Sequence, residues 1–316
     1  MKPTQRGAAL LMAMLTAAMV ATLAATASWR IWQLTAVETA EANRAQLGWL
    51  LQGALDWSRL ILREDARANR SNAVDHLNEP WALPLEEARL STFLAARDSA
   101  AAQGPTTEAF LSGHITDMQG RFNLNNLWQG NDLSAPDVLA LVRLLELLRQ
   151  DTKPWLQAID RLDPSADNSA LVRPQRLSEW QWAGLSPAQI EFMSPYLSVL
   201  PKRTKLNVNT APPPVMAAVF GVLTLAEAQS LVRERNLKPF ESLPDFGQRH
   251  PELSAAVDGN RLATASDFFE VTGILRLDQH SVSESSLLER NGLNVTVIWR
   301  ERSTQRLTTN PETADL

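Results

Sequence analysis

The chain has 316 residues, a formal net charge of −5 at pH 7 and no cysteine. Its length allows a membrane helix and two modest domains, and the lack of cysteine excludes disulfides, a thiol nucleophile and thiolate metal sites. The negative net charge argues against a nucleic-acid surface, because binding to phosphates depends on clustered cations.

The chain begins with a short basic segment that leads into an apolar run. Lys2 and Arg6 precede residues 8–28, which contain no charged residue and no proline. At a helical rise of about 1.5 Å per residue, this run spans about 31 Å, enough to cross the hydrocarbon core of a bilayer. Because the first acidic residue is Glu38, the positive-inside rule predicts a cytoplasmic N-terminus and export of everything after Arg30.

The helical pattern continues beyond the apolar run. No proline occurs from Ala8 to about Asp65, and the residues there are mostly good helix formers. Leucines recur at an approximate helical period after the membrane stretch. The sequence therefore predicts one long helix, apolar in its first half and amphipathic in its second. A secretory signal cleaved after Ala27 is the alternative.

The junction before the apolar run resembles the class III leader of type IV pilins and type II secretion pseudopilins. Gln5-Arg6-Gly7 is followed directly by Ala8 and further apolar residues. In those proteins the prepilin peptidase cuts after the glycine, so the resemblance implies cleavage between Gly7 and Ala8. The fifth mature residue would then be Met12, where most of these proteins carry glutamate. The general secretion pathway protein K family typically lacks that acid.

A second motif lies in residues 113–127. Asp117 to Gly120 has turn chemistry, in which aspartate bonds to nearby backbone and glycine accepts a positive φ. Apolar residues on both sides nearly alternate, which predicts a β-hairpin. The stretch Asp-x-x-Gly-Arg-Phe-Asn-Leu-Asn-x-Leu is also similar to a motif of the same protein K family.

The remaining elements follow from apolar periodicity and turn residues. Residues 65–110 are predicted to be irregular, with one short helix near 85–97. Further helices are predicted at 133–149, 155–162, 186–199, 215–220 and 225–235. Two strands are predicted at 268–275 and 293–299, and a polar turn followed by two leucines is expected between them, in 279–290.

The pair of helices after Leu206 looks like a helix-hairpin-helix unit. Asn207-x-Asn209-Thr210-Ala211 precedes a helix, a turn and a second helix. Such units bind the DNA backbone in uptake and repair proteins, so a membrane-anchored DNA receptor is an alternative function. However, the turn has a single glycine, Gly221, and basic and acidic residues nearly balance over 205–250. No basic face is predicted.

The resemblance covers nearly the whole chain from Gln5 to Trp299, and it implies an α+β fold. A long membrane-spanning helix would precede a pilin-like αβ domain, split by an inserted all-α domain with helix-hairpin-helix (SAM-like) character. The expected boundaries are the leader at 1–7, the transmembrane part at 8–30, the first αβ part at 31–130, the insertion at 131–259 and the remaining strands and tail at 260–316.

Catalysis finds little support in the sequence. The four histidines are scattered, and neither His-Glu-x-x-His nor Gly-x-Ser-x-Gly occurs. We therefore expect no enzymatic activity, with a membrane-anchored periplasmic enzyme as the alternative.

Calcium is a possible ligand by resemblance. Protein K relatives carry calcium ligands in an Asp/Trp/Asp stretch followed by Gly-Ala-Glu. The matching stretch here keeps Asp160, Asp163 and Asp167, but it has Arg161 where an aromatic residue is common and lacks Gly-Ala-Glu. The alternative is a solvated acidic loop whose aspartates cap helices.

The resemblance thus implies a minor pseudopilin of the type II secretion system. It would cap the tip of the pseudopilus and help to start its assembly. Its partners would be the minor pseudopilins of the I and J kinds, other pseudopilins through the N-terminal helix, and the prepilin peptidase, but no nucleic acid. The chain would pass once through the inner membrane, with most of its residues in the periplasm.

Overall fold

The structure, a computed structural model, describes residues 6–69, 73–89, 109–163, 172–277 and 280–306. The chain forms two compact units, Met1–Gly53 and Ala54–Leu316. Each unit is described by itself below.

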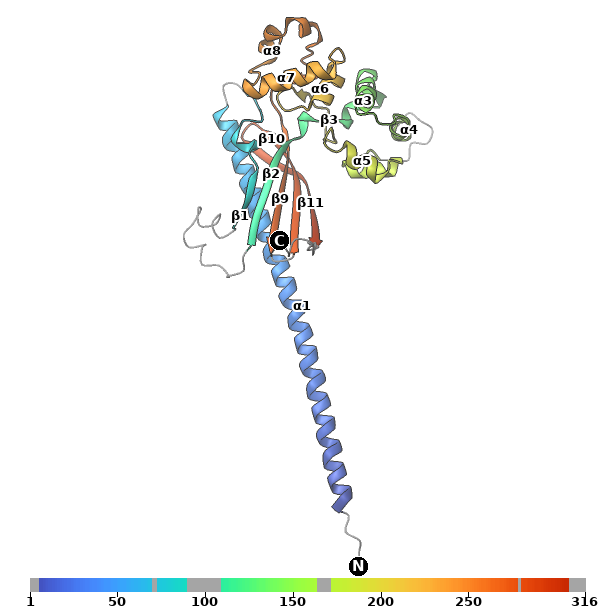
Figure 1. Cartoon of the computed structure of the whole chain (residues 1–316), viewed down its shortest axis with the longest axis vertical. Coiled ribbons are helices and arrows are strands. Elements are labelled where there is room, and N and C mark those ends of the chain that lie inside the picture. Colours follow the sequence, from blue (N-terminus) through green and yellow to red (C-terminus); the bar gives the residue numbers. More distant parts are fainter. Residues whose placement is uncertain (1–5, 70–72, 90–108, 164–171, 278–279, 307–316) are drawn as a thin grey trace, which may run out of the picture. The chain divides into compact units, whose positions relative to one another are not determined.

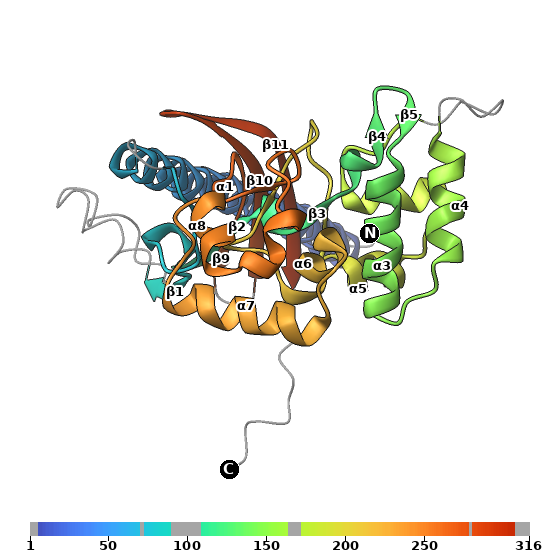
Figure 2. The same ribbon diagram turned by 90° about the horizontal axis from the view of Figure 1, so that it is seen from above.

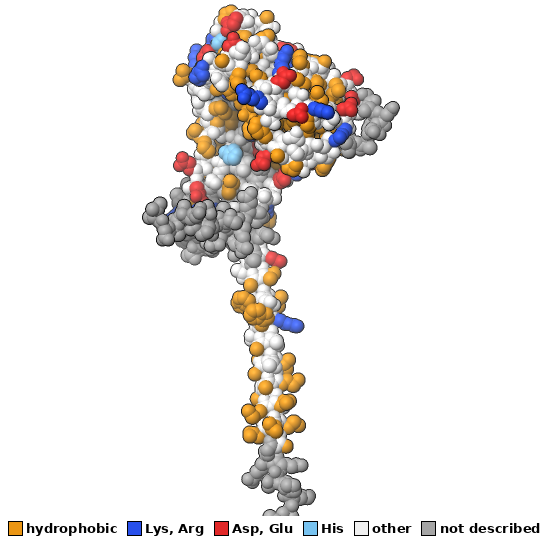
Figure 3. Space-filling view, turned by 45° about the vertical axis from the view of Figure 1, so that its right-hand side comes forward, with side chains coloured by type: hydrophobic (Ala, Val, Ile, Leu, Met, Phe, Trp, Pro, Cys, Tyr) orange, Lys and Arg blue, Asp and Glu red, His pale blue; other side chains and the backbone are white. Residues whose placement is uncertain are grey.

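A single helix, α1 (Arg6–Ala68), runs through the first unit and into the second. The predicted long helix is therefore confirmed. In its apolar part, Thr16, Thr22 and Thr26 each donate a hydroxyl hydrogen bond to a carbonyl oxygen of the preceding turn. These bonds satisfy the hydroxyl protons of the three threonines on a mostly apolar surface. Figure 3 shows hydrophobic side chains along the face of this part that is in view.

The second unit contains a five-stranded antiparallel sheet with strand order β1-β2-β9-β10-β11. The strands are β1 (Leu85–Arg89), β2 (Ala109–Asp117), β9 (Phe268–Leu277), β10 (His280–Asn291) and β11 (Asn294–Arg306). β2 and β9 are neighbours in this sheet although 150 residues separate the end of one from the start of the other.

The two faces of this sheet differ in chemistry. On one face Phe269, Val271 and Leu288 pack with Leu55 of α1 and with Trp81 of a short 3-10 turn, η1 (Pro80–Ala82). The other face is mixed: Phe268 and Leu287 pack with Met118 and Leu200, whereas the hydroxyl oxygens of Thr272 and Ser285 lie 3.0 Å apart. One packed face and one more polar face are usual for an antiparallel sheet.

An inserted region lies between β2 and β9, and most of its regular structure is helical (Figures 1 and 2). Its helices are α3 (Ala135–Leu147), α4 (Lys153–Leu162), α5 (Pro187–Met193), α6 (Pro213–Phe220), α7 (Leu225–Leu237) and α8 (Leu243–Arg249). Its 3-10 turns are η3 (Met118–Gly120), η4 (Leu124–Leu127), η5 (Leu177–Ala183) and η6 (Pro251–Ala256). Its short strands are β3 (Phe122–Asn123), β4 (Trp128–Gln129), β5 (Asp132–Leu133), β6 (Leu197–Ser198), β7 (Leu206–Asn207) and β8 (Leu262–Ala263).

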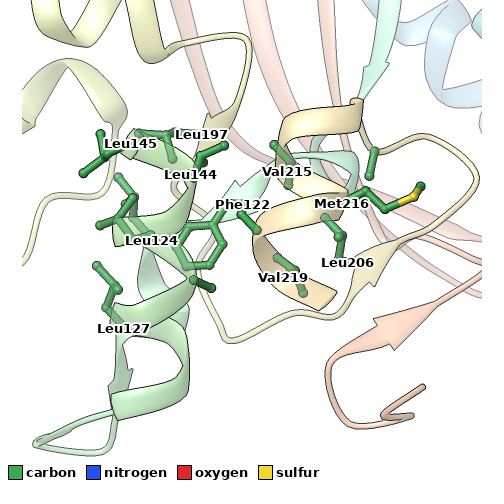
Figure 4. Packing of buried hydrophobic residues seen from close by; sticks show 14 of the residues in the cluster. Phe122, Leu124, Leu127, Leu144, Leu145, Leu197, Leu206, Val215, Met216 and Val219 are labelled. Carbon is green, nitrogen blue, oxygen red and sulfur yellow. The ribbon is translucent and has the colours of Figure 1, made fainter. Parts of the chain in front are cut away.

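The insertion has its own hydrophobic core. Phe122 lies between the leucines of α3 and the face of α6 that carries Val215 and Val219 (Figure 4). Trp180 is close to two other indole rings, with centroid distances of 6.1 and 6.2 Å to Trp155 and Trp128. These apolar contacts are continuous from β3 to β8, so the insertion folds around one core rather than as separate hairpins.

Three local predictions were wrong because strand pairing outweighed local propensity. The start of the helix expected near 85–97 is strand β1, whose Ala88 pairs with Leu111 of β2; residues 90–97 lie outside the described range. The polar turn expected in 279–290 is β10, which pairs with β9 and β11 along its length. The helix expected at 186–199 ends at Met193, because Leu197 pairs with Phe122.

The hairpin expected in 113–127 does not form, although the turn within it does. Asp117 caps η3 by accepting a hydrogen bond from the Gln119 backbone N–H. The strands on either side diverge, since β2 pairs with β1 and β9 whereas β3 pairs with β6. Gly120 is not needed for a positive φ; a Cβ there would lie 2.7 Å from Thr210 Oγ1 and 3.0 Å from its carbonyl carbon. Close approach to Thr210 explains this glycine.

Candidate functional site

The first candidate site is the apolar part of α1. Ala8–Thr39 is long and apolar enough to cross a membrane, and none of its most apolar window is buried. Of the other described helices, α6 and α7 meet the same criteria only as a pair bent by 118°, and α6 is largely buried in the insertion. The rings of Trp29 and Trp32 lie 5.2 Å apart near the end of the apolar stretch, as is common at membrane interfaces. α1 therefore suits anchoring by a single pass.

The residues of the expected leader junction lie at the start of α1. Gly7 and Ala8 belong to its first turns, while residues 1–5 lie outside the described range. Met12 is 68 % exposed, and its carbonyl oxygen accepts a hydrogen bond from Thr16 Oγ1 at 3.0 Å. The helix thus presents an apolar, uncharged side chain at this position.

The expected calcium ligands are only partly described. Asp160 is exposed in the last turn of α4, and Asp163 follows that helix directly, its N–H donating to the Asp160 carbonyl oxygen at 3.3 Å. Asp167 lies outside the described residues. Arg161, the departure from the relatives' pattern, donates a hydrogen bond of 2.8 Å to the Ala183 carbonyl oxygen. Its role is to fix the end of α4 to η5.

A buried polar network joins the insertion to the sheet, and Asp117 is at its centre. Asp117 is 4 % exposed, and its Oδ2 accepts hydrogen bonds from Asn207 Nδ2 at 3.0 Å, Thr210 Oγ1 at 2.6 Å and Ser266 Oγ at 2.6 Å. Its Oδ1 accepts from the Gln119 N–H at 2.8 Å. One carboxylate therefore ties the end of β2 to β7, to the segment before α6 and to the segment before β9.

A second buried cluster lies beside it and centres on Arg290 of β10. The guanidinium forms ion pairs with Asp75 at 2.6 Å and Asp65 at 2.7 Å, and donates to the Ser266 carbonyl oxygen at 2.8 Å. One oxygen each of Asp65, Asp75 and Glu79 lies within 4.8 Å of the others. Arg290 supplies the positive charge for this acidic group, and Ser266 connects it to the Asp117 network.

Burial sets the ionisation of these acids. It raises the pKa of Asp75 to about 7, while Arg290 and the Ser266 N–H act in the opposite direction. It raises the pKa of Asp65 to about 6, with repulsion from Glu79 adding to the effect. Burial also raises the pKa of Asp117, against four hydrogen-bond donors. The carboxyls where insertion meets sheet therefore keep their protons to higher pH than exposed carboxyls do.

Sequence reasoning found part of this network. The turn at Asp117 and the segment with Asn207 and Thr210 both stood out, and the structure brings them together. It missed Asp75, Ser266 and Arg290. Asp75 and Ser266 lie between regular elements and Arg290 lies in the unexpected β10, so no local pattern marked them.

The helix pair of the expected helix-hairpin-helix unit offers no continuous basic face. Arg235 is 3 % exposed, and burial lowers its pKa to about 10. Arg249 forms an ion pair with Glu234, and Arg233 donates to Ser230 Oγ at 2.7 Å. Cations that are buried or paired in this way do not meet the needs of phosphate-backbone binding.

Comparisons with known proteins show similarity to one component of the type II secretion system. The model of the family "Type II secretion system (T2SS), protein K" matches residues 206–271. Type II secretion system protein K of Pseudomonas aeruginosa is 28 % identical over 95 % of this chain and 90 % of that protein. The protein of the same name from Pectobacterium carotovorum is 26 % identical over 98 % of this chain and 100 % of its own length.

A solved structure shares the fold. It is that of the GspK-GspI-GspJ complex from the type 2 secretion system of enterotoxigenic Escherichia coli, with a TM-score of 0.63 and 18 % identity. The alignment covers 84 % of this chain and 98 % of that one. The leader-like junction, the apolar helix and the motif in residues 113–127 indicate the same group. Over nearly its whole length, the chain is therefore similar to type II secretion system protein K.

Proposed function

We propose that this chain caps the tip of a pseudopilus and helps to start its assembly, so that proteins can be exported across the outer membrane. The observation that carries the proposal is the similarity to type II secretion system protein K over nearly the whole chain. The similarity to these secretion-system proteins also confirms the prediction that the chain is not an enzyme. The chain would work through assembly, without turnover.

The proposed partners follow from the same relationship. In the solved structure, the similar protein is part of a complex with GspI and GspJ. Minor pseudopilins of the I and J kinds are therefore the expected neighbours here. Other pseudopilins would pack against the apolar part of α1 in the inner membrane. Beyond the membrane, Ala54–Leu316 would lie in the periplasm. The insertion adds bulk beyond one end of the sheet (Figure 1), which would hinder addition of a further subunit there.

The expected domain boundaries stay a proposal, with the insertion at 131–259 and the remaining strands and tail at 260–316, but the core of the inserted region also includes Phe122 and Leu262 just outside these limits. We also propose helix-hairpin-helix (SAM-like) character for α6 and α7. Gly221 ends α6 with a φ of +74°, and Thr224 begins α7 through a capping box with Glu227. These local features support a tight hairpin between the two helices.

Calcium binding by Asp160, Asp163 and Asp167 also stays a proposal. Two of the three carboxylates lie at the same end of α4, as a shared cation would require. Full ligation would need further oxygen atoms.

The first prediction concerns processing. If the prepilin peptidase reads Arg6-Gly7, the protein extracted from membranes will begin at Ala8 and keep the whole apolar helix. Intact-mass measurement of the purified protein checks this, and Gly7→Leu should block the cut because the peptidase requires a small residue there. A mature protein that begins at Ser28 would identify a secretory signal and contradict the pilin-like pathway.

The second prediction concerns Met12. A carboxylate in the membrane is costly unless a neighbour neutralises it, and a subunit at the very tip has no further subunit to supply an amino group. We therefore expect Met12→Glu to reduce co-isolation of the I and J partners and export of secreted proteins. Met12→Leu, which stays apolar, is the matched control and should behave as the parent.

Protein level and membrane extraction are measured alongside, because the periplasmic unit should remain folded in both variants. If the Met12→Glu variant supports normal export at a normal protein level, the missing acid at this position is unrelated to a location of the subunit at the tip. Loss of export without loss of the complex would place its role after assembly.

A further inference from the structure

A polar recess of about 150 Å³ lies inside the insertion, and no role has been assigned to it above. Residues from β3, η4, α3, β7 and α6 contribute to its lining, together with residues just before β3, β7 and β8. Phe122, Leu206 and Val219 supply its apolar part; all three are labelled in Figure 4. The recess therefore rests on the core of the insertion, where its lining residues are held in place by packing.

The charges around this recess are unequal. Its lining contains four cationic side chains and one carboxylate, contributed by Arg121, Arg203, Lys205, Arg261 and Asp137. The chain as a whole carries a net charge of −5. A concentration of positive charge in one recess of an acidic protein attracts anions to that place.

The single carboxylate is already fully engaged. Asp137 is 4 % exposed, its Oδ2 accepts from Arg203 at 2.9 Å and from Ser134 Oγ at 2.6 Å, and its Oδ1 accepts from Arg261 at 3.3 Å. Asp137 orients the two guanidinium groups but balances only one of the two charges. The Nε–H groups of Arg203 and Arg261 donate no hydrogen bond to any described residue.

Arg121 and Lys205 are the other two cations of the lining. Among the residues that the structure describes, neither the Arg121 nor the Lys205 side chain forms a hydrogen bond or an ion pair. The charges of Glu270 and Asp117 act on Arg121 from a distance, and Lys205 is exposed. Donors for an anion are thus available from two separate segments of the lining.

We propose that this recess binds an oxyanion, with Arg121 and Lys205 as the principal donors and the Nε–H groups of Arg203 and Arg261 completing the contacts. A carboxylate or a phosphate fits this chemistry, because both accept several charge-assisted hydrogen bonds at once. The apolar lining strengthens these interactions by lowering the local dielectric. A carboxylate could come from an acidic side chain of another protein, and a phosphate from solution.

Titration of the full-length chain in neutral-detergent micelles with inorganic phosphate at low ionic strength tests the proposal. Binding is followed by the ³¹P linewidth of the phosphate. We expect saturable binding that Lys205→Gln weakens roughly tenfold, as loss of one charge-assisted hydrogen bond implies. Lys238→Gln removes an exposed lysine outside the recess and should leave binding unchanged.

A second variant tests the proposal without a risk of unfolding the insertion. Asn260→Asp adds a negative charge at the exposed rim without removing packed atoms, and it should also weaken binding. Competition with glutarate distinguishes the sources: displacement of phosphate indicates that protein carboxylates are accepted, and no displacement indicates a preference for phosphate. Absence of saturable binding, or equal weakening by Lys205→Gln and Lys238→Gln, would overturn the proposal.

Discussion

Asp117→Ala is expected to lower the free energy of unfolding by about 3–5 kcal/mol, the range for breaking a buried charged network. The substitution removes the acceptor of four hydrogen bonds, from Gln119 N–H, Asn207 Nδ2, Thr210 Oγ1 and Ser266 Oγ. Asn207 and Ser266 are 0 % and 3 % exposed, so water cannot readily replace the lost carboxylate.

Urea unfolding of the full-length chain, followed by tryptophan fluorescence, measures this loss. Asp258→Ala is the matched control, because Asp258 is exposed and its carboxylate accepts one local hydrogen bond, from the Asn260 N–H at 2.9 Å. The control should cost no more than about 1 kcal/mol. A loss of that small size for Asp117→Ala would mean that the network does not hold the insertion to the sheet.

The Asp117 network also illustrates what the sequence could predict. The turn was recognisable because aspartate and glycine stand three residues apart, which is a local signal. The partners Asn207, Thr210 and Ser266 are 90 to 149 residues away. Their meeting depends on how β7 and β9 are placed, and no pattern within a short window encodes that placement.

Long, strongly patterned segments were predicted well because their signals are local. α1 and the helices α3, α4, α6 and α7 follow from apolar spacing and from helix-starting residues in their own sequence. β10 was missed because serine and glutamate fill much of it, and both are poor indicators of strands. Pairing with β9 and β11 on both sides supplies the stability that local propensity lacks.

The candidate sites also differ in whether their residues are contiguous in the sequence. The leader junction and Met12 are contiguous in sequence, so resemblance could identify them. The oxyanion recess draws two of its cations from the short basic stretch at 202–205, and the other two from positions 121 and 261, which are far from it in the sequence. Only the folded insertion brings them together.

The acidic cluster around Arg290 should make the stability of this chain depend on pH in an unusual direction. Asp75 has a pKa of about 7 in the folded chain against a reference value of 3.8. The folded state therefore binds more protons than the unfolded state between these values, and the free energy of unfolding falls as pH rises through this window. The stabilising proton is fully present below about pH 4 and is lost above about pH 7.

Arg290→Met should make this dependence steeper. At pH 8, Asp75 and Asp65 would be ionised without their ion-pair partner, at an expected cost of about 3–5 kcal/mol. At pH 5 both carboxyls can be protonated, so the cost should be less than half as large. Arg276→Met is the control, because it breaks an exposed pair with Glu87 worth at most about 1 kcal/mol. Urea unfolding at both pH values decides the matter: equal losses for Arg290→Met would show that burial does not retain protons on this cluster.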